Sequence, residues 1–246
     1  MKIFFTTILF FSCLVLNTFA ADSPQIGTIT FILGGKNDVS IKHHNSKQWN
    51  AAKLKMAVVN DDVLRTRQES RCEVKLNNGD IVRIGENTVF EFATARDQMQ
   101  KDVRAELKNG KVWANLAPFK SPNKQFQIKA PTAVCAVRGT IYRIDADSLT
   151  RCSVYQGQVD VGPVSLWGMP QQQQESRSLQ PVEVPGPTEI PPPYQVSLDQ
   201  WIQIVQGFQI IVRPDGKYAK SKIDQQADSQ DEWVKWNQEF DSKVRR

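Results

Sequence analysis

The chain has 246 residues, enough for one sizeable hydrophobic core with a small appendage and too few for several domains. Its 40% hydrophobic, 9% aromatic and 23% charged residues are typical of a globular protein and exclude a wholly disordered, collagen-like or coiled-coil chain. The net charge of +5 comes from 31 basic and 26 acidic residues that alternate along the chain. This pattern excludes the nucleic-acid-binding class, in which basic residues gather on one face.

The first 20 residues have the pattern of a secretory signal peptide. Lys2 precedes an apolar run over residues 3–19, and Thr18-Phe19-Ala20 offers small residues at the positions that signal peptidase reads. The run is shorter than a retained anchor of ~20 apolar residues, and no later stretch is apolar enough to span a membrane. We therefore expect cleavage after Ala20, export to the periplasm or the cell surface, and a mature protein without an integral membrane span.

Residues 22–165 have the pattern of an all-β domain, because short runs rich in Val, Ile, Phe and Thr alternate with turn residues. A strand-turn-strand motif occurs three times, with its turn glycine at Gly79, Gly110 or Gly157. Glycine supplies the positive φ that a tight hairpin turn requires. The irregular spacing excludes a strict repeat. The motif predicts stacked hairpins in a twisted solenoid-like or two-sheet arrangement, and both arrangements stay open.

Three cysteines, Cys72, Cys135 and Cys152, remain after the predicted cleavage. Cys72 and Cys152 alternate with polar residues so that each shares a face with apolar neighbours, which predicts burial. The alternative in an oxidising compartment is a disulfide between Cys135 and Cys152. No pair has the Cys-x-x-Cys spacing of a zinc or redox site.

Residues 166–196 are rich in proline and glutamine, with four consecutive glutamines at 171–174. Such a stretch cannot bury a core and favours extended conformations, so it predicts a linker or a strap on the domain.

Residues 197–246 predict a short helical tail. The apolar residues between Leu198 and Phe208 recur at helical spacing, which predicts an amphipathic helix there. Residues 209–216 predict a strand ending in a turn. A capping box formed by Ser229 and Glu232 predicts a second helix after it.

Three tryptophans of this tail, Trp201, Trp233 and Trp236, are candidate binding residues. The last two share a helix face with Phe240. Two interpretations stay open: the rings pack on their own domain, or they anchor a partner, since tryptophan is enriched in interface hot spots.

The sequence lacks the patterns of catalytic sites. The only histidines, His43 and His44, are adjacent, so their rings point to opposite sides of an extended chain and form a poor metal site. There is no Gly-x-Ser-x-Gly motif and no glycine-rich phosphate loop. We therefore expect no enzyme activity, no cofactor and no metal.

Arg138-Gly139-Thr140 interrupts an otherwise apolar strand over residues 130–144. Glycine inside a strand predicts a bulge or a close backbone approach, and an arginine among apolar residues needs a partner. These three residues have a structural role or contact a ligand, and they are candidate binding residues.

Six segments resemble the successive blocks of the FecR domain, in the same order, and Arg138-Gly139-Thr140 with the preceding Pro131 is the most specific part. The resemblance covers roughly residues 55–163, in blocks at 61–66, 74–88, 110–113, 130–134, 137–140 and 153–159. The family is known for bacterial envelope proteins whose periplasmic domain receives a signal from an outer-membrane transporter and relays it to a cytoplasmic sigma factor. That relay needs a membrane span and a cytoplasmic helical domain, and this sequence has the pattern of neither. The resemblance thus implies a stand-alone, exported, non-catalytic binding or scaffolding domain.

Two functions agree with these observations. The first is an interaction module that binds an envelope protein or a cell-wall component, with a role in envelope signalling and with the tail tryptophans as anchors. The second is a structural component that self-associates through sheet edges or through Cys72.

Overall fold

The computed structural model describes residues 24–93, 103–118, 126–168 and 196–244. The predicted signal peptide and most of the predicted linker lie outside the described residues. The described residues form eighteen strands that pair into two sheets, with a short 3-10 helix, η1 (Val164–Leu166), and two α-helices near the C-terminus. The prediction of an all-β fold with a helical C-terminal end is therefore confirmed. Of the two arrangements left open, the chain adopts the two-sheet one.

Sheet A contains ten strands, and all of its pairs are antiparallel. From one edge to the other they are β4 (Ala57–Val59), β1 (Gln25–Leu33), β6 (Arg71–Leu76), β7 (Ile81–Ile84), β9 (Val103–Asn115), β12 (Ile141–Ala146), β13 (Thr150–Gln156), β17 (Phe208–Val212), β18 (Lys217–Lys222) and β15 (Val196–Ser197).

Sheet B contains nine strands and shares β9 with sheet A. From one edge to the other they are β3 (Asn50–Ala51), β2 (Val39–Lys42), β5 (Val63–Thr66), β8 (Val89–Glu91), β9, β10 (Phe126–Lys129), β11 (Val134–Val137), β14 (Gln158–Gly162) and β16 (Ile202–Val205). The β9–β10 pair is parallel.

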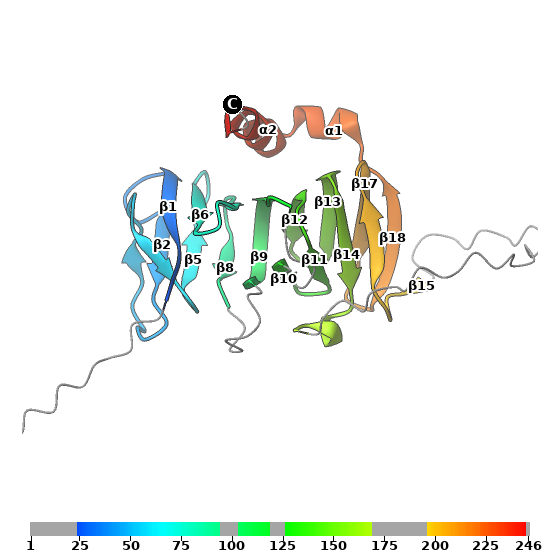
Figure 1. The fold of residues 1–246 in the computed structure, drawn as a ribbon, viewed down its shortest axis with the longest axis horizontal. Helices are drawn as coiled ribbons and strands as arrows, with labels where there is room; N and C mark the ends of the chain where they lie inside the picture. The colour runs from blue at the N-terminus through cyan, green and yellow to red at the C-terminus, as the bar shows by residue number, and fades with distance from the viewer. Residues whose placement is uncertain (1–23, 94–102, 119–125, 169–195, 245–246) are drawn as a thin grey trace, which may run out of the picture.

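The core lies between the two sheets and follows from the alternation along each strand. In β6, Cys72, Val74 and Leu76 point into the core, and the residues between them point outward. Because each fully buried aliphatic side chain contributes about 1.5–3 kcal/mol, this shared core stabilises both sheets together. Seen in Figure 1, the strands follow the chain along the long axis, from β1 at one end to β17 and β18 at the other.

The chain repeatedly crosses from one sheet to the other, and residues with positive φ lie at these crossings. They are Gly34, Asn37, Lys55, Asp61, Glu69, Asn87, Gly110, Gly139, Gly157 and Gly207. A positive φ reverses the chain direction within a few residues, which a corner between two packed sheets requires as much as a hairpin does.

Of the three predicted hairpins, only the one at Gly79 forms. It joins β6 to β7 within sheet A. Asn109-Gly110 instead lies inside β9, at the point where this strand passes from sheet B to sheet A. Gly157 joins β13 of sheet A to β14 of sheet B. The prediction of hairpins at Gly110 and Gly157 was wrong because both corners and hairpins require the same positive φ.

The predicted helix between Leu198 and Phe208 was also wrong. Residues 202–205 of this segment form β16, which pairs with β14 and buries Ile204 in the core. A short apolar run fits either periodicity, and here the open edge of sheet B decides in favour of a strand. The predicted strand over 209–216 is confirmed as β17, with its turn at Gly216.

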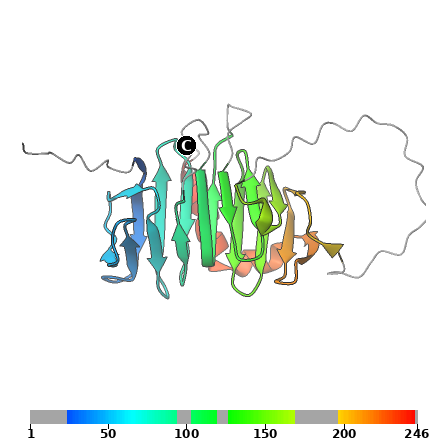
Figure 2. The same cartoon turned by 90° about the horizontal axis from the view of Figure 1, so that it is seen from below.

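The two α-helices are α1 (Gln225–Gln230) and α2 (Glu232–Val244). Asp224 caps α1 by accepting hydrogen bonds from two backbone N–H groups, and Asp231 Oδ1 accepts from Trp233 N at the start of α2. The predicted capping residue Ser229 lies inside α1, so the helix starts two residues later than a Ser229 cap would place it. The view from below shows the strands in front of both helices (Figure 2).

No helix in the described part of the chain is long and apolar enough to cross a membrane.

Candidate binding surface

A buried ion pair holds α2 on the outer face of sheet A. Arg83 of β7 has a side chain that is 0% exposed, and its Nη1 donates to Asp241 Oδ1 at 2.6 Å. Its Nε donates to Glu73 Oε2 at 2.7 Å. The other oxygen of Asp241 accepts a hydrogen bond from Trp113 Nε1 at 2.9 Å. One carboxylate of α2 is thus bound by two neighbouring strands.

Two further carboxylates fix the start of the helical segment. Arg143 of β12 donates from Nη1 to Asp231 Oδ2 at 2.8 Å, and Tyr155 of β13 donates from its hydroxyl to Asp228 Oδ2 at 2.8 Å. Burial, together with this hydrogen bond, raises the pKa of Tyr155 far above its ordinary value, so the phenol stays a donor. Acidic side chains of the helices therefore meet cationic and hydrogen-bond-donating side chains of sheet A.

The two tryptophans of α2 have different environments. Trp233 is 2% exposed and packs in a cluster with Trp113 and Ile141 of its own domain. Trp236 is half-buried, with its ring centroid 5.5 Å from that of Phe31 and 4.6 Å from that of Phe240. Trp233 thus packs on its own domain, as the first of the two interpretations expected. Trp236 also packs there, but part of its ring lies at the surface.

This difference predicts unequal effects of truncation. Trp233→Ala should lower the free energy of unfolding by about 3–5 kcal/mol, because it leaves a cavity in a buried cluster. Trp236→Ala should cost roughly half as much, because its ring has less apolar area to lose. Urea unfolding measures both values. Equal losses for the two variants would contradict the assignment of Trp233 as the buried ring.

The Arg143–Asp231 pair predicts a dependence on acid. Burial alone would raise the pKa of Asp231, but the Arg143 guanidinium and two backbone N–H groups hold it below its ordinary value of 3.8. A carboxyl whose pKa is lower in the folded than in the unfolded chain stabilises the fold at neutral pH and loses this contribution as the pH falls through the folded pKa. The stabilisation from Asp231 should therefore disappear below about pH 4.

Comparison with Asp231→Asn isolates this contribution. The unfolding free energies of the two proteins should differ at pH 7 and converge as the pH falls below about 4. The neighbouring Asp145 has the opposite sign, because burial raises its pKa despite Arg143, and so its protonation favours the fold in acid. Asp145 is present in both proteins and cancels in the comparison. A constant difference from pH 7 to pH 2 would exclude Asp231 as the group that titrates.

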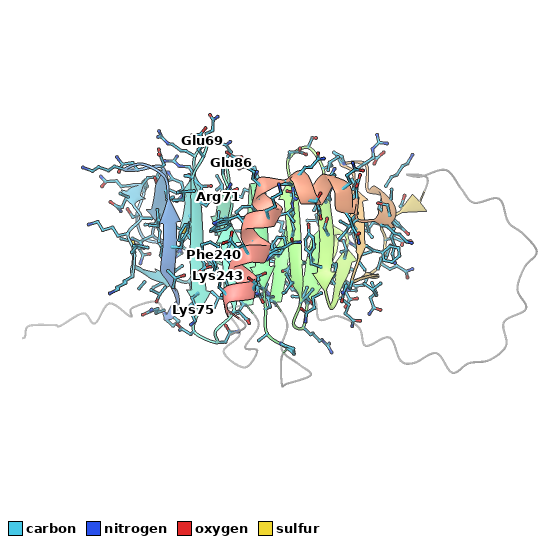
Figure 3. All side chains as sticks on the ribbon, turned by 90° about the horizontal axis from the view of Figure 1, so that it is seen from above. Glu69, Arg71, Lys75, Glu86, Phe240 and Lys243 are labelled. Carbon is cyan, nitrogen blue, oxygen red and sulfur yellow. The ribbon has the colours of Figure 1, made fainter. Side chains whose placement is uncertain are left out.

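Part of the outer face of sheet A, beside α2, carries apolar and cationic side chains together. We call this surface the α2 flank; it consists of Phe31, Leu33, Arg71, Lys75, Trp236, Phe240 and Lys243. Leu33 is 45% exposed. Figure 3 shows Arg71 and Lys75 along β6, with Phe240 and Lys243 of α2 beside them.

The cations of the α2 flank lie against its rings. The Arg71 guanidinium carbon is 5.2 Å from the Trp236 ring centroid, and Lys243 Nζ is 5.3 Å from that of Phe240. Lys243 also pairs with Glu239, whereas neither Arg71 nor Lys75 forms an ion pair with any residue that the structure describes. The surface therefore offers aromatic area with positive charge.

Arg138, Gly139 and Thr140 lie elsewhere, at the corner between β11 and β12. A Cβ on Gly139, which has a φ of +115°, would overlap Pro118 Cα and lie 2.7 Å from Pro118 N. Thr140 is buried and donates from Oγ1 to the Gln158 carbonyl at 2.7 Å. Arg138 is exposed and lowers the pKa of Asp160, which burial raises more strongly. The close backbone approach expected at Gly139 is confirmed.

Trp201 is not brought together with the tryptophans of α2. Its ring packs on sheet B, because a Cβ added to Gly162 would lie 2.8 Å from Trp201 Cε3. The candidate residues thus occupy three separate places: the β11–β12 corner, the outer face of sheet B and the outer face of sheet A.

All three cysteines are buried free thiols. Burial raises the pKa of Cys72 to about 12. Cys135 and Cys152 extend from different sheets and share a hydrogen bond that, together with burial, raises the pKa of Cys152. The predicted burial is confirmed, and the disulfide between Cys135 and Cys152 stays a prediction about the oxidised protein.

Sequence reasoning missed the strand residues that bind α2, namely Arg83, Trp113, Arg143 and Tyr155. A usable signal was present: Arg83 interrupts an apolar strand, and a buried charge needs a partner of opposite sign. The acidic residues of the last helix were the available partners.

The two histidines are partly exposed, and each lies beside an acidic residue, of which Asp62 is buried. His43 Nδ1 is 3.0 Å from Asp62 Oδ1, and His44 Nδ1 is 3.6 Å from Asp61 Oδ2. The described ranges contain no group of three or more His, Cys, Asp or Glu side chains that could hold a metal ion.

Comparison with known proteins finds a family model and similar solved structures. The family model described as FecR protein matches residues 62–160. Two crystal structures of "a putative anti-sigma factor from Parabacteroides distasonis ATCC 8503" are 19% and 20% identical to this chain, each with a TM-score of 0.45. Each alignment covers 67% of this chain and 61% of that chain. No curated protein matches. The matched region runs from the start of β5 through β14 and contains the corner at Gly139, so residues 62–160 of this chain are a FecR domain.

Proposed function

We propose that the protein is an exported, non-catalytic FecR-domain protein that binds an envelope protein and acts in envelope signalling. The α2 flank is the observation that carries this proposal. Exposed apolar side chains next to aromatic rings and unpaired cations are typical of protein interfaces rather than of solvated surfaces.

The signalling role rests on the FecR family, and export rests on the pattern of the first 20 residues. The proposed partner is a protein rather than a cell-wall glycan, because Leu33 and Phe31 add aliphatic and aromatic area that a glycan would leave partly unused.

Self-association has less support. An intermolecular disulfide through Cys72 is disfavoured, because this side chain is 0% exposed. The edge strand β15 covers only Lys217 and Tyr218 of β18, which leaves Lys220 and Lys222 on the open part of this edge, and lysines there disfavour pairing with a second copy.

A site-specific crosslinking experiment in bacterial cells tests the proposal. A photo-reactive residue placed at Leu33 of the full chain should give one discrete adduct with an envelope protein. The same residue at Gln203, exposed on β16 of sheet B, is the matched control and should give none. Cell fractionation should find the processed chain outside the cytoplasm.

Three results would overturn the proposal. They are a chain that stays unprocessed in the cytoplasm, equal adducts at both positions, and no adduct at either position. An adduct of twice the chain's own mass would favour self-association, and an adduct released by muramidase would favour a cell-wall component.

A further inference from the structure

The contact between α2 and sheet A shows which ligand chemistry this face binds. Asp241 meets Arg83 and Trp113, Asp231 meets Arg143, and Trp233 fills the space between. The outer face of sheet A therefore binds carboxylates of a helical segment that also has an apolar side.

The part of this face that α2 does not cover, on β6 and β1, also combines cationic and apolar side chains. Arg71 on β6 lies on the same outer face as Glu73, which pairs in register with Arg83. Leu33 and Phe31 of β1 lie opposite Arg71 and Glu73, so they share that face. The carboxylate of Glu73 already binds Arg83 and Thr30, which leaves Arg71 and Lys75 as the cations there with no ion pair among the described residues. Arg71 also interacts at longer range with the Glu86 carboxylate and lies over the Trp236 ring.

The spacing of the strands leaves room for one more helix. Asp241 places the C-terminal part of α2 over the boundary between β7 and β9. The boundary between β1 and β6 lies two strands away, or about 9.6 Å at ~4.8 Å per strand. Packed helices lie about 8–10 Å apart. A helix over β1 and β6 would therefore pack directly against α2.

We propose that the α2 flank binds an acidic amphipathic helix of a partner protein, which lies beside α2 over β1 and β6. This inference rests on the proposed function and names the class of partner. Trp236 and Phe240 of α2 form one wall for its apolar side, and Phe31 with Leu33 forms the floor.

The positions of the cations set the pattern of acids on the partner. Arg71 and Lys75 are four residues apart on β6, or roughly 13 Å at ~3.3 Å per residue. At ~1.5 Å per residue of helix, this distance corresponds to acids about two turns apart on one face. Lys243 at the end of α2 can bind a third acid from the side.

A binding titration with a designed probe tests the inference. The probe is a synthetic 18-residue helical peptide with glutamates on one face, leucines and a phenylalanine on the other, and no Lys or Arg. The peptide should bind the purified protein in low salt. Arg71→Glu with Lys75→Glu should weaken binding at least tenfold, because both charges then repel the peptide. Lys217→Glu, which changes an exposed lysine on β18, is the matched control and should leave the affinity unchanged.

The single variant Lys75→Glu keeps the test valid if the double variant loosens α2. Lys75 has no ring contact among the described residues, so its replacement should weaken binding by several fold without changing the fold. Circular dichroism checks the fold of every variant.

Several results would overturn the inference. They are no binding of the acidic peptide, equal binding of a counterpart with lysine at every glutamate, and binding of anionic phosphatidylglycerol vesicles with no binding of the peptide. Failure here together with a specific adduct at Leu33 in cells would leave the proposed function standing and change only the class of partner. Failure of both experiments would remove the proposed function as well.

Discussion

Asp241→Ala is expected to free α2 from sheet A and to lower the free energy of unfolding by about 3 kcal/mol. The change removes the carboxylate that binds both Arg83 and Trp113 and leaves Glu73 as the one carboxylate bound to Arg83 among the described residues. Undocking lets water reach Arg83, so the cost is limited to the docking energy of the helix. Urea unfolding measures the loss, and amide hydrogen exchange over 232–244 should rise toward that of an unprotected segment.

Two further variants test the cause of this loss. Ser242→Ala changes an exposed neighbour on the same helix and should have little effect. Arg83→Met and Asp241→Leu, combined with Glu73→Gln so that no carboxylate loses its cation, should recover most of the stability, because neutral side chains of similar size avoid the cost of burying the charges. If this triple variant is as unstable as Asp241→Ala, the buried ion pair is not the reason for the loss.

Gly139→Ala is expected to lower the free energy of unfolding by about 3 kcal/mol. A positive φ costs an alanine about 1–2 kcal/mol. The overlap of the new methyl group with the backbone of Pro118 adds about 1–3 kcal/mol, because a backbone atom cannot move aside as a flexible side chain can.

Gly79→Ala is the matched control for this prediction. Gly79 has a φ of +91°, but a Cβ there would meet nothing within 4 Å. The control should therefore lose only the conformational part, about 1–2 kcal/mol. Urea unfolding of the two variants separates the terms, and equal losses would mean that the contact with Pro118 adds nothing.

The sequence predicted the strands better than their connections. The alternation in β6 and β12 places apolar residues on one side of each strand, and this pattern needs no knowledge of the rest of the fold. The positions of Gly110 and Gly157 were also readable as places where the chain changes direction, and Gly139 as a bulge or a close backbone approach. Whether the next strand pairs in the same sheet or crosses to the other depends on the core between the sheets, which no local pattern reports.

The segment from Leu198 to Phe208 shows a different limit. Its apolar spacing suits a helix, but a strand there completes the edge of sheet B and buries Ile204. Tertiary pairing outweighs the local periodicity, because the backbone gains hydrogen bonds with β14.

The candidate surface was predictable only in part. Trp233 and Trp236 marked the last helix as important, and their spacing indicated a shared face. The strands that receive this helix lie far from it in the sequence: Arg83 and Asp241 are 158 positions apart. Charge complementarity matches such a pair but does not locate it in the fold.

This separation also sets the order in which the face is covered as the protein is made. β7, β9 and β13 precede α2 in the chain, so a chain that emerges from its N-terminus displays Arg83, Trp113 and Tyr155 with no helix over them until α2 follows. An mRNA truncated before the codon for residue 231 would yield a chain with all of its described strands but without α2. The part of the outer face of sheet A that α2 covers would then stay exposed to solvent. Such a product would depend on chaperones for solubility and would be an early target for proteolysis, although its β core is intact.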